Sequence, residues 1–209
     1  MASNDRGSAV FKDVGGAQPR GYEGFEGVIA PEVEDSTPWW PQPTRATPGA
    51  PNVIMILIDD MGFSDIAPFG SEIPTPGLSS LADDGYRFTN FRVTPLCSPT
   101  RAALLTGSNS HRSGFGYVSH IDPGFPGVSM QVPREMPTLA ESYRSNGYAT
   151  YMVGKWHLTR ESEMHDGGDR SSWPLQRGFD RYFGSLDGFT TLYHPHRIVR
   201  DNSVVTEEF

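Results

Sequence analysis

The feature of this sequence that most constrains its fold is an unbroken apolar run at residues 53–58, Val-Ile-Met-Ile-Leu-Ile. The run shows no alternation of apolar and polar side chains, so a strand built from it has to be covered on both faces. Such a run is typical of a central strand in a parallel sheet that lies under helices. The first prediction is therefore a buried strand at 53–58 in an α/β fold.

The segments that follow carry helix and strand signals in turn. Residues 75–85 begin with Thr-Pro and end with Gly, which predicts a helix with Thr75 as its cap, and residues 86–93 alternate as a strand does. Further helices are predicted at 98–107 and within 136–147, and a further strand at 148–154. This succession predicts an α/β domain with a mostly parallel central sheet flanked by helices.

Residues 1–50 differ from the remainder of the chain. They are rich in proline and acidic residues near their end and show no apolar periodicity, which predicts an irregular N-terminal arm. The folded domain is predicted at residues 51–209.

Charge and hydropathy exclude several classes of partner. The net charge is −8 with no basic stripe, so no nucleic-acid partner is expected. No apolar run approaches the roughly 20 residues that cross a bilayer, so no membrane contact is expected. Residues 1–16 lack the apolar core of a signal peptide, and we therefore expect a cytoplasmic protein.

Two adjacent carboxylates, Asp59 and Asp60, follow the apolar run directly. In open α/β sheets ligands bind beyond the carboxyl ends of the strands. Neighbouring carboxylates repel each other unless a cation lies between them, and Ca²⁺ or Mg²⁺ prefers oxygen ligands of this kind. The alternative is a solvated strand end that caps the following turn.

Cys97 is the single cysteine of the chain, so it cannot form an internal disulfide. It lies at the start of the predicted helix 98–107, where free backbone N–H groups favour an anion. Arg101 follows one turn later and can face the same point. The spacing excludes a tyrosine phosphatase, in which five residues separate the cysteine from the arginine; here there are three. A buried structural cysteine is the other alternative.

Three motifs resemble those of the type I sulfatases, members of the alkaline phosphatase superfamily. Cys97, Pro99 and Arg101, followed by Leu-Thr-Gly at 105–107, resemble the first signature of that family. Gly-Lys-Trp-His at 154–157 resembles the second. Ile-Asp-Asp-Met-Gly at 58–62 is similar to the family's metal-binding segment, and residues 176–184 match a segment that we interpret as structural.

The resemblance implies a sulfuric ester hydrolase, arylsulfatase-like, whose cysteine is oxidised to formylglycine by a formylglycine-generating enzyme. One hydroxyl of the hydrated aldehyde at Cys97 would attack the sulfur of a small sulfate ester, and the second would expel the bound sulfate. Asp59 and Asp60, with the oxygen at position 97, would hold one Ca²⁺ ion. Arg101 and Lys155 would neutralise charge.

His157 would assist removal of a proton in the release step. Without the resemblance, Lys155 and His157 would be interpreted as a solvated lysine and a satisfied histidine.

The later ligands of the family have no clear counterparts. Sulfatases of this type carry an Asp-Asn pair, a second lysine and a second histidine in their later half. Asp201-Asn202 lacks a preceding buried strand, and His194 and His196 are interpreted as surface or substrate-side residues. We therefore expect an N-terminal portion of a longer catalytic domain. Two alternatives stay open: a phosphonate monoester or phosphodiester hydrolase that uses the same site, and a non-catalytic truncated fragment.

Overall fold

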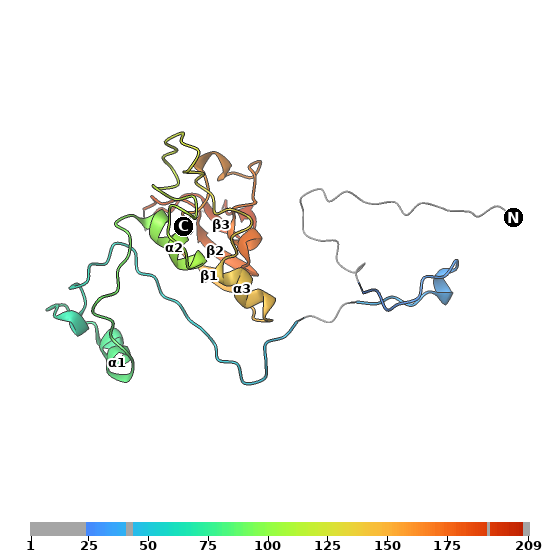
Figure 1. Ribbon diagram of the computed structural model, residues 1–209, viewed down its shortest axis with the longest axis horizontal. Coiled ribbons are helices and arrows are strands. Elements are labelled where there is room, and N and C mark those ends of the chain that lie inside the picture. The colour runs from blue at the N-terminus through green and yellow to red at the C-terminus, as the bar shows by residue number, and fades with distance from the viewer. Residues whose placement is uncertain (1–23, 41–43, 192, 207–209) are drawn as a thin grey trace. The chain divides into compact units, whose positions relative to one another are not determined.

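The computed structural model describes residues 24–40, 44–191 and 193–206. The chain divides into two compact units, 1–44 and 45–209 (Figure 1). Residues 1–23 and 41–43 of the predicted arm lie outside the described residues. Residues 1–16, from which the cytoplasmic location was predicted, are among them. In the described part of the first unit, Val28 and Thr37 form an antiparallel bridge. A short 3₁₀-helix, η1, spans Val33–Asp35.

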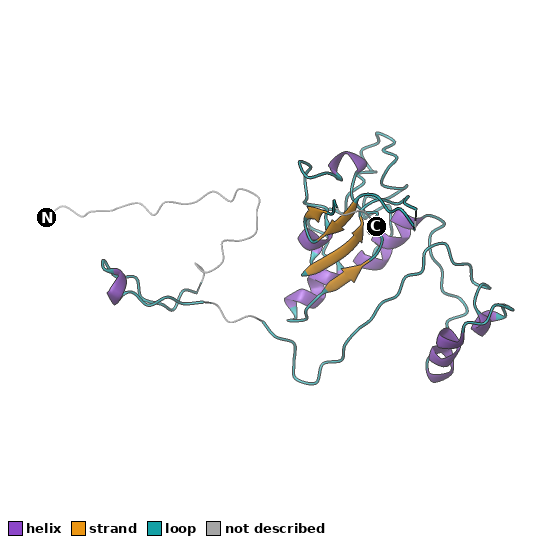
Figure 2. Ribbon diagram, turned by 180° about the vertical axis from the view of Figure 1, so that it is seen from behind, coloured by secondary structure: helices purple, strands orange, loops and turns teal. Residues whose placement is uncertain are grey.

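The second unit is built on a four-stranded sheet in the order β1-β2-β3-β4 (Figure 2). Its strands are β1 (Tyr151–Val153), β2 (Arg181–Ser185), β3 (Ile198–Arg200) and β4 (Ser203–Val204). β1 and β2 run parallel, and the other two neighbouring pairs are antiparallel. The α/β class is confirmed, and in the described residues the sheet is mixed.

The described residues form three α-helices: α1 (Pro76–Asp84), α2 (Cys97–Thr106) and α3 (Leu139–Ser145). α3 begins with a capping box in which Thr138 Oγ1 accepts from the backbone N–H of Glu141, whose side chain accepts from the Thr138 N–H. The predicted cap of α1, Thr75, lies at the N-cap position, but its side chain forms no hydrogen bond with a backbone N–H of α1. Thr75 Oγ1 instead accepts from Ala67 N at 3.0 Å. Ala67 opens η2 (Ala67–Phe69), and further 3₁₀-helices are η3 (Glu161–Glu163) and η4 (Pro174–Arg177).

The core of the second unit lies between α2, the sheet and the long connections. Ala102 of α2, Tyr182 of β2 and Val199 of β3 are buried in one cluster with Trp156 and Trp173. Because Trp156 comes soon after β1, separated from it by Gly154 and Lys155, this cluster fixes the chain where it leaves the sheet. The segment therefore presents the residues that flank Trp156 in a fixed position.

A buried arginine ties the end of η4 to α3. Arg177 is 2% exposed and donates to the carbonyl oxygens of Val132 and Met136. It also pairs with Glu141, Nε to Oε1 at 3.3 Å. Since a buried guanidinium is costly unless every partner is present, this network holds three connections in place.

The strands predicted at 53–58 and 86–93 are not formed. Both segments lack strand hydrogen bonds, and Ile54 and Ile56 are 85% and 75% exposed. A strand needs the backbone groups of a neighbour and cover for its apolar side chains, and no described residue supplies either to these segments. The apolar pattern alone does not create a strand. Among the described residues, no helix is both long and apolar enough to cross a membrane.

Candidate active site

The N-terminal end of α2 carries the free thiol of Cys97, which is half-buried. Pro99 fits the first turn because the first N–H groups of a helix have no intrahelical partner. The helix ends at Gly107, whose left-handed φ of 63° lets its N–H reach Ala103 O at 2.9 Å. Ser98 and Arg101 are buried, so this helix end is fixed in the protein interior.

His157 lies beside the thiol. Its Nδ1 is 3.0 Å from Cys97 Sγ, and its ring is completely buried. Burial, followed by the positive charge of Lys155 and the neighbouring His120, lowers the pKa of His157 from the usual 6.5 to about 3. The imidazole is therefore neutral at neutral pH and has a nitrogen lone pair that can accept a proton.

The backbone places His157 by continuing the sheet ladder past β1. Gly154 N donates to Phe183 O, Trp156 N donates to Ser185 O, and His157 N donates to Leu186 O, at 2.9, 2.9 and 3.1 Å. His157 itself has a left-handed φ of 56°. Such a conformation is uncommon for a non-glycine residue, and the flanking hydrogen bonds and the buried Trp156 hold it.

The predicted charged residues meet at Asp59. Lys155 Nζ lies 2.8 Å from Asp59 Oδ2, and Arg101 Nη2 lies 3.1 Å from Oδ1. Partial burial acts to raise the pKa of Asp59, but the hydrogen bonds and charges of Lys155 and Arg101 outweigh it and hold that pKa below its usual value. Arg101 Nη1 also donates to the Lys155 carbonyl oxygen at 2.6 Å.

Arg101 retains one unsatisfied donor. Its Nε is buried and has no hydrogen-bond partner among the described residues. A buried donor without a partner is costly and calls for an explanation.

The donors at Asp59 and Asp60 fit a hard divalent cation in kind, because carboxylate oxygens are the ligands that Ca²⁺ and Mg²⁺ prefer. They do not complete a site, since Ca²⁺ takes about six to eight oxygens. Within the described ranges, no group of three or more His, Cys, Asp or Glu side chains could hold a metal ion. Asp60 is exposed in a turn with φ of 54°, and Asp59 is neutralised by its two cationic neighbours.

The remaining candidates lie elsewhere. Asp201 is in the turn between β3 and β4, where Oδ1 accepts from Tyr182 N at 3.0 Å, which is a structural contact. His194 is exposed. His196 Nε2 lies 3.3 Å from Asp187 Oδ2.

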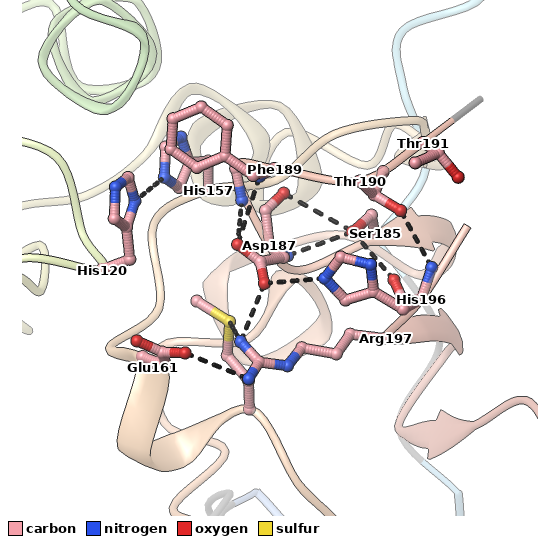
Figure 3. Close-up of polar contacts among 12 residues, drawn as sticks. His120, His157, Glu161, Ser185, Asp187, Phe189, Thr190, Thr191, His196 and Arg197 are labelled. Atoms are coloured by element: carbon pink, nitrogen blue, oxygen red, sulfur yellow. Dashed lines mark hydrogen bonds and ion pairs between the residues drawn. The ribbon is translucent and has the colours of Figure 1, made fainter. Parts of the chain in front are cut away.

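Two residues near His157 were not predicted from the sequence, His120 and Asp187 (Figure 3). His120 Nδ1 is 3.0 Å from His157 Nε2. Both residues lie in irregular connections without periodicity, and the only local signal was a histidine in the loop that follows the Cys97 motif.

Asp187 fixes the chain behind His157. Burial acts to raise the pKa of Asp187, but hydrogen bonds from the N–H groups of Phe189 and Gly188, with the charge of Arg197, hold it below its usual value. Arg197 Nη1 lies 2.8 Å from Asp187 Oδ2. Gly188 packs against the imidazole so closely that a Cβ there would lie 2.0 Å from His157 Nε2.

Comparisons with known proteins match this arrangement to a family. A family model described as Sulfatase matches residues 51–203. The arylsulfatase of Klebsiella aerogenes is 38% identical over 69% of this chain and 30% of the relative, and human N-acetylgalactosamine-6-sulfatase is 38% identical over 66% and 26%. The crystal structure of Ps i-CgsB is similar with a TM-score of 0.52 and 33% identity, over 64% of this chain and 27% of that chain.

Proposed function

The chain belongs to the sulfatase family, and on that premise we propose that the protein is a sulfuric ester hydrolase that cleaves sulfate monoesters, as an arylsulfatase does. The chain spans 30% and 26% of the lengths of the two curated relatives, so the activity is proposed for the protein in which these residues complete their site. The observation that carries the proposal is the position of His157 Nδ1, 3.0 Å from Cys97 Sγ at the start of a buried helix.

In this proposal Cys97 is the precursor of formylglycine, and its sulfur marks the place that a hydroxyl oxygen of the hydrated aldehyde takes. Formylglycine, once formed by a formylglycine-generating enzyme, supplies the nucleophile for sulfate transfer. His157 is the proposed acceptor of a proton from this position, because its Nδ1 faces it at 3.0 Å. The free N–H groups at the start of α2 favour negative charge at the same point.

Arg101 and Lys155 are proposed to neutralise the sulfate oxygens. Arg101 lies one helical turn from position 97 and Lys155 lies two residues before His157, and both contact Asp59. The unsatisfied Nε of Arg101 is a donor available to an oxygen of the anion. Their fixed positions supply this charge without rearrangement during the reaction.

We propose that Asp59, Asp60 and the oxygen at position 97 would bind one divalent cation. Ca²⁺ is proposed because all three donors are oxygens. Such an ion, when bound, withdraws electron density from the oxygens that it contacts. Lys155 and Arg101 contact the same carboxylate of Asp59.

The sulfate ester is favoured over phosphorus esters because the matched relatives are sulfatases. A non-catalytic role is not favoured for the same reason. We propose further that residues 51–209 form the N-terminal part of the catalytic domain and 1–50 an irregular arm. The cytoplasmic location stays a prediction, which cell fractionation tests.

Two measurements test the function. After co-expression with a formylglycine-generating enzyme, mass spectrometry of the peptide containing residues 94–101 should show the aldehyde at position 97, and Cys97→Ala is the control. Unmodified thiol alone would reject the precursor role. The intact protein should then hydrolyse an aryl sulfate faster than the matching aryl phosphonate; the reverse order would favour the phosphonate hydrolase.

A further inference from the structure

The imidazole of His157 has a second nitrogen that the proposed reaction does not use. This nitrogen, Nε2, lies 3.0 Å from His120 Nδ1, and the two ring planes are nearly parallel, with 6° between them. Among the described residues, His120 is the hydrogen-bond partner that the structure gives to Nε2. The three side chains therefore form a line from Cys97 through His157 to His120 (Figure 3 shows the two histidines).

The backbone next to His120 is anchored independently of His157. The N–H of the preceding residue, Ser119, donates to Ser98 Oγ at 3.1 Å, and both serines are buried. Ile121 N donates to Val118 O at 3.1 Å, which closes a turn around His120. Because Ser98 is the second residue of α2, the helix that positions Cys97 also positions the loop that carries His120.

The His157 ring is also bounded on its other sides. Phe189 meets His120 edge to face, with centroids 4.8 Å apart and planes at 76°, and meets His157 at 6.4 Å. Gly188 leaves no room beside the ring, since a Cβ there would lie 2.0 Å from two of its atoms. The imidazole is therefore confined to one orientation, with Nδ1 toward Cys97 and Nε2 toward His120.

A neutral imidazole carries its single proton on either Nδ1 or Nε2. The hydrogen bond that one of these nitrogens forms determines which of the two is protonated. To accept a proton from position 97, His157 needs a free lone pair on Nδ1, so its own proton has to be on Nε2. An Nε2–H needs an acceptor. His120 Nδ1 is that acceptor when His120 carries its own proton on Nε2. His120 itself is only partly buried.

We propose that His120 is a positioning residue, whose Nδ1 accepts a hydrogen bond from His157 Nε2–H and so keeps the lone pair of His157 Nδ1 directed at position 97. The inference rests on the proposed sulfatase function for its catalytic consequence. The tautomer can be measured whether or not that function holds, because both ring contacts are present in the chain itself. His120 does not contact the substrate in this account and acts through His157.

An isosteric pair of variants separates hydrogen bonding from packing. In His120→Asn the side-chain oxygen takes the place of Nδ1 and keeps an acceptor, whereas His120→Leu has a similar shape and no acceptor. His111→Ala is the matched control, since His111 is an exposed histidine in the same connection after α2. Thermal unfolding of all variants shows whether each is folded before the other measurements are compared.

The direct readout is the tautomer of His157, obtained from ¹⁵N ring shifts of the intact protein labelled in its histidines. The His157 signals are assigned by their loss in His157→Gln. We expect the Nε2–H tautomer in the wild type, in His120→Asn and in His111→Ala, and a shift toward Nδ1–H in His120→Leu. An Nδ1–H tautomer in the wild type, or an unchanged tautomer in a folded His120→Leu, would overturn the inference. Should His120→Leu not fold, the wild-type and His120→Asn spectra alone decide.

The kinetic readout uses an aryl sulfate and the matured intact protein. His120→Leu should lower kcat by about 10- to 100-fold with little change in KM, as loss of an orienting partner does, and His120→Asn should recover most of it. A folded His120→Leu with wild-type kcat contradicts the inference while the sulfatase function stands. If the wild type hydrolyses no sulfate ester, the proposed function fails, and the tautomer measurement still decides the role of His120.

Discussion

Two regions of the second unit share an apolar, motif-rich sequence but differ in what surrounds them. Around α2, β1 and β2, the side chains of Trp156, His157 and Arg177 are buried, and each forms hydrogen bonds with its surroundings. The segment 53–58 is more apolar than any of these, yet it lies exposed and without strand pairing. The difference teaches that an apolar pattern marks a segment for burial, while the partners that bury it have to come from elsewhere in the chain.

The largest expected contrast is between the rates of amide hydrogen exchange in β2 and in residues 53–58, measured on the chain of residues 1–209. Amides of β2, which pair with β1 and β3, should exchange about 1,000-fold more slowly than their intrinsic rates, while those of 53–58 should exchange near intrinsic rates. Mass spectrometry of exchanged peptides provides both values. Strong protection of 53–58 would mean that the segment pairs in this chain and would remove the contrast.

The second effect concerns the buried arginine of the packed region. Arg177→Leu leaves the carbonyl oxygens of Val132 and Met136 without their donor and Glu141 without its cation. We expect the free energy of unfolding to fall by about 3 kcal/mol. Denaturant unfolding measures it, and a loss below about 1 kcal/mol would show that the network is not essential to the fold.

A third prediction concerns pH and the carboxylate behind His157. Because the pKa of Asp187 is held below the usual 3.8, its charged form stabilises the folded state. This stabilisation is complete above the unfolded pKa and is lost as pH falls through the folded one. Asp187→Asn should therefore cost about 2 kcal/mol at pH 7 and progressively less as the pH falls below about 4.

Unfolding of both proteins across this pH range is the measurement. A difference between wild type and Asp187→Asn that stays constant from pH 7 to pH 3 would contradict the ionised, hydrogen-bonded Asp187.

The smallest expected change in the free energy of unfolding concerns Arg181, an arginine on the surface that is compared with the buried Arg177. Arg181 is exposed and pairs with Asp201 at 3.5 Å, so its charge is solvated in both the folded and unfolded states. Arg181→Met should change the free energy of unfolding by less than about 0.5 kcal/mol. A loss as large as that of Arg177→Leu would show that burial does not distinguish the two arginines.

The sequence predicted the parts of the site that local rules govern. Gly107 ends α2 as a stop signal does, Pro99 lies in its first turn, and the helix begins at Cys97, one residue before the predicted start; the predicted strand at 148–154 contains β1. Asp59, Arg101 and Lys155, which their motifs singled out, contact one another, and their metal-binding and catalytic roles stay predictions.

Other parts depend on tertiary contacts that no local pattern encodes. His120 reaches His157 because Ser119 binds the start of α2, and Asp187 is held by Arg197 from ten residues further along the chain. The strands at 53–58 and 86–93 failed for the related reason that pairing requires a neighbour.

The most direct test of the account is the rate of aryl sulfate hydrolysis by the matured intact protein and its Cys97→Ala variant. We predict turnover by the wild type and a loss of at least about 1,000-fold in kcat/KM for Cys97→Ala, because the nucleophile position is then empty of any reactive group. Equal rates for the two proteins, in samples shown to be folded, would contradict the claim that position 97 and its neighbour His157 form the reaction centre.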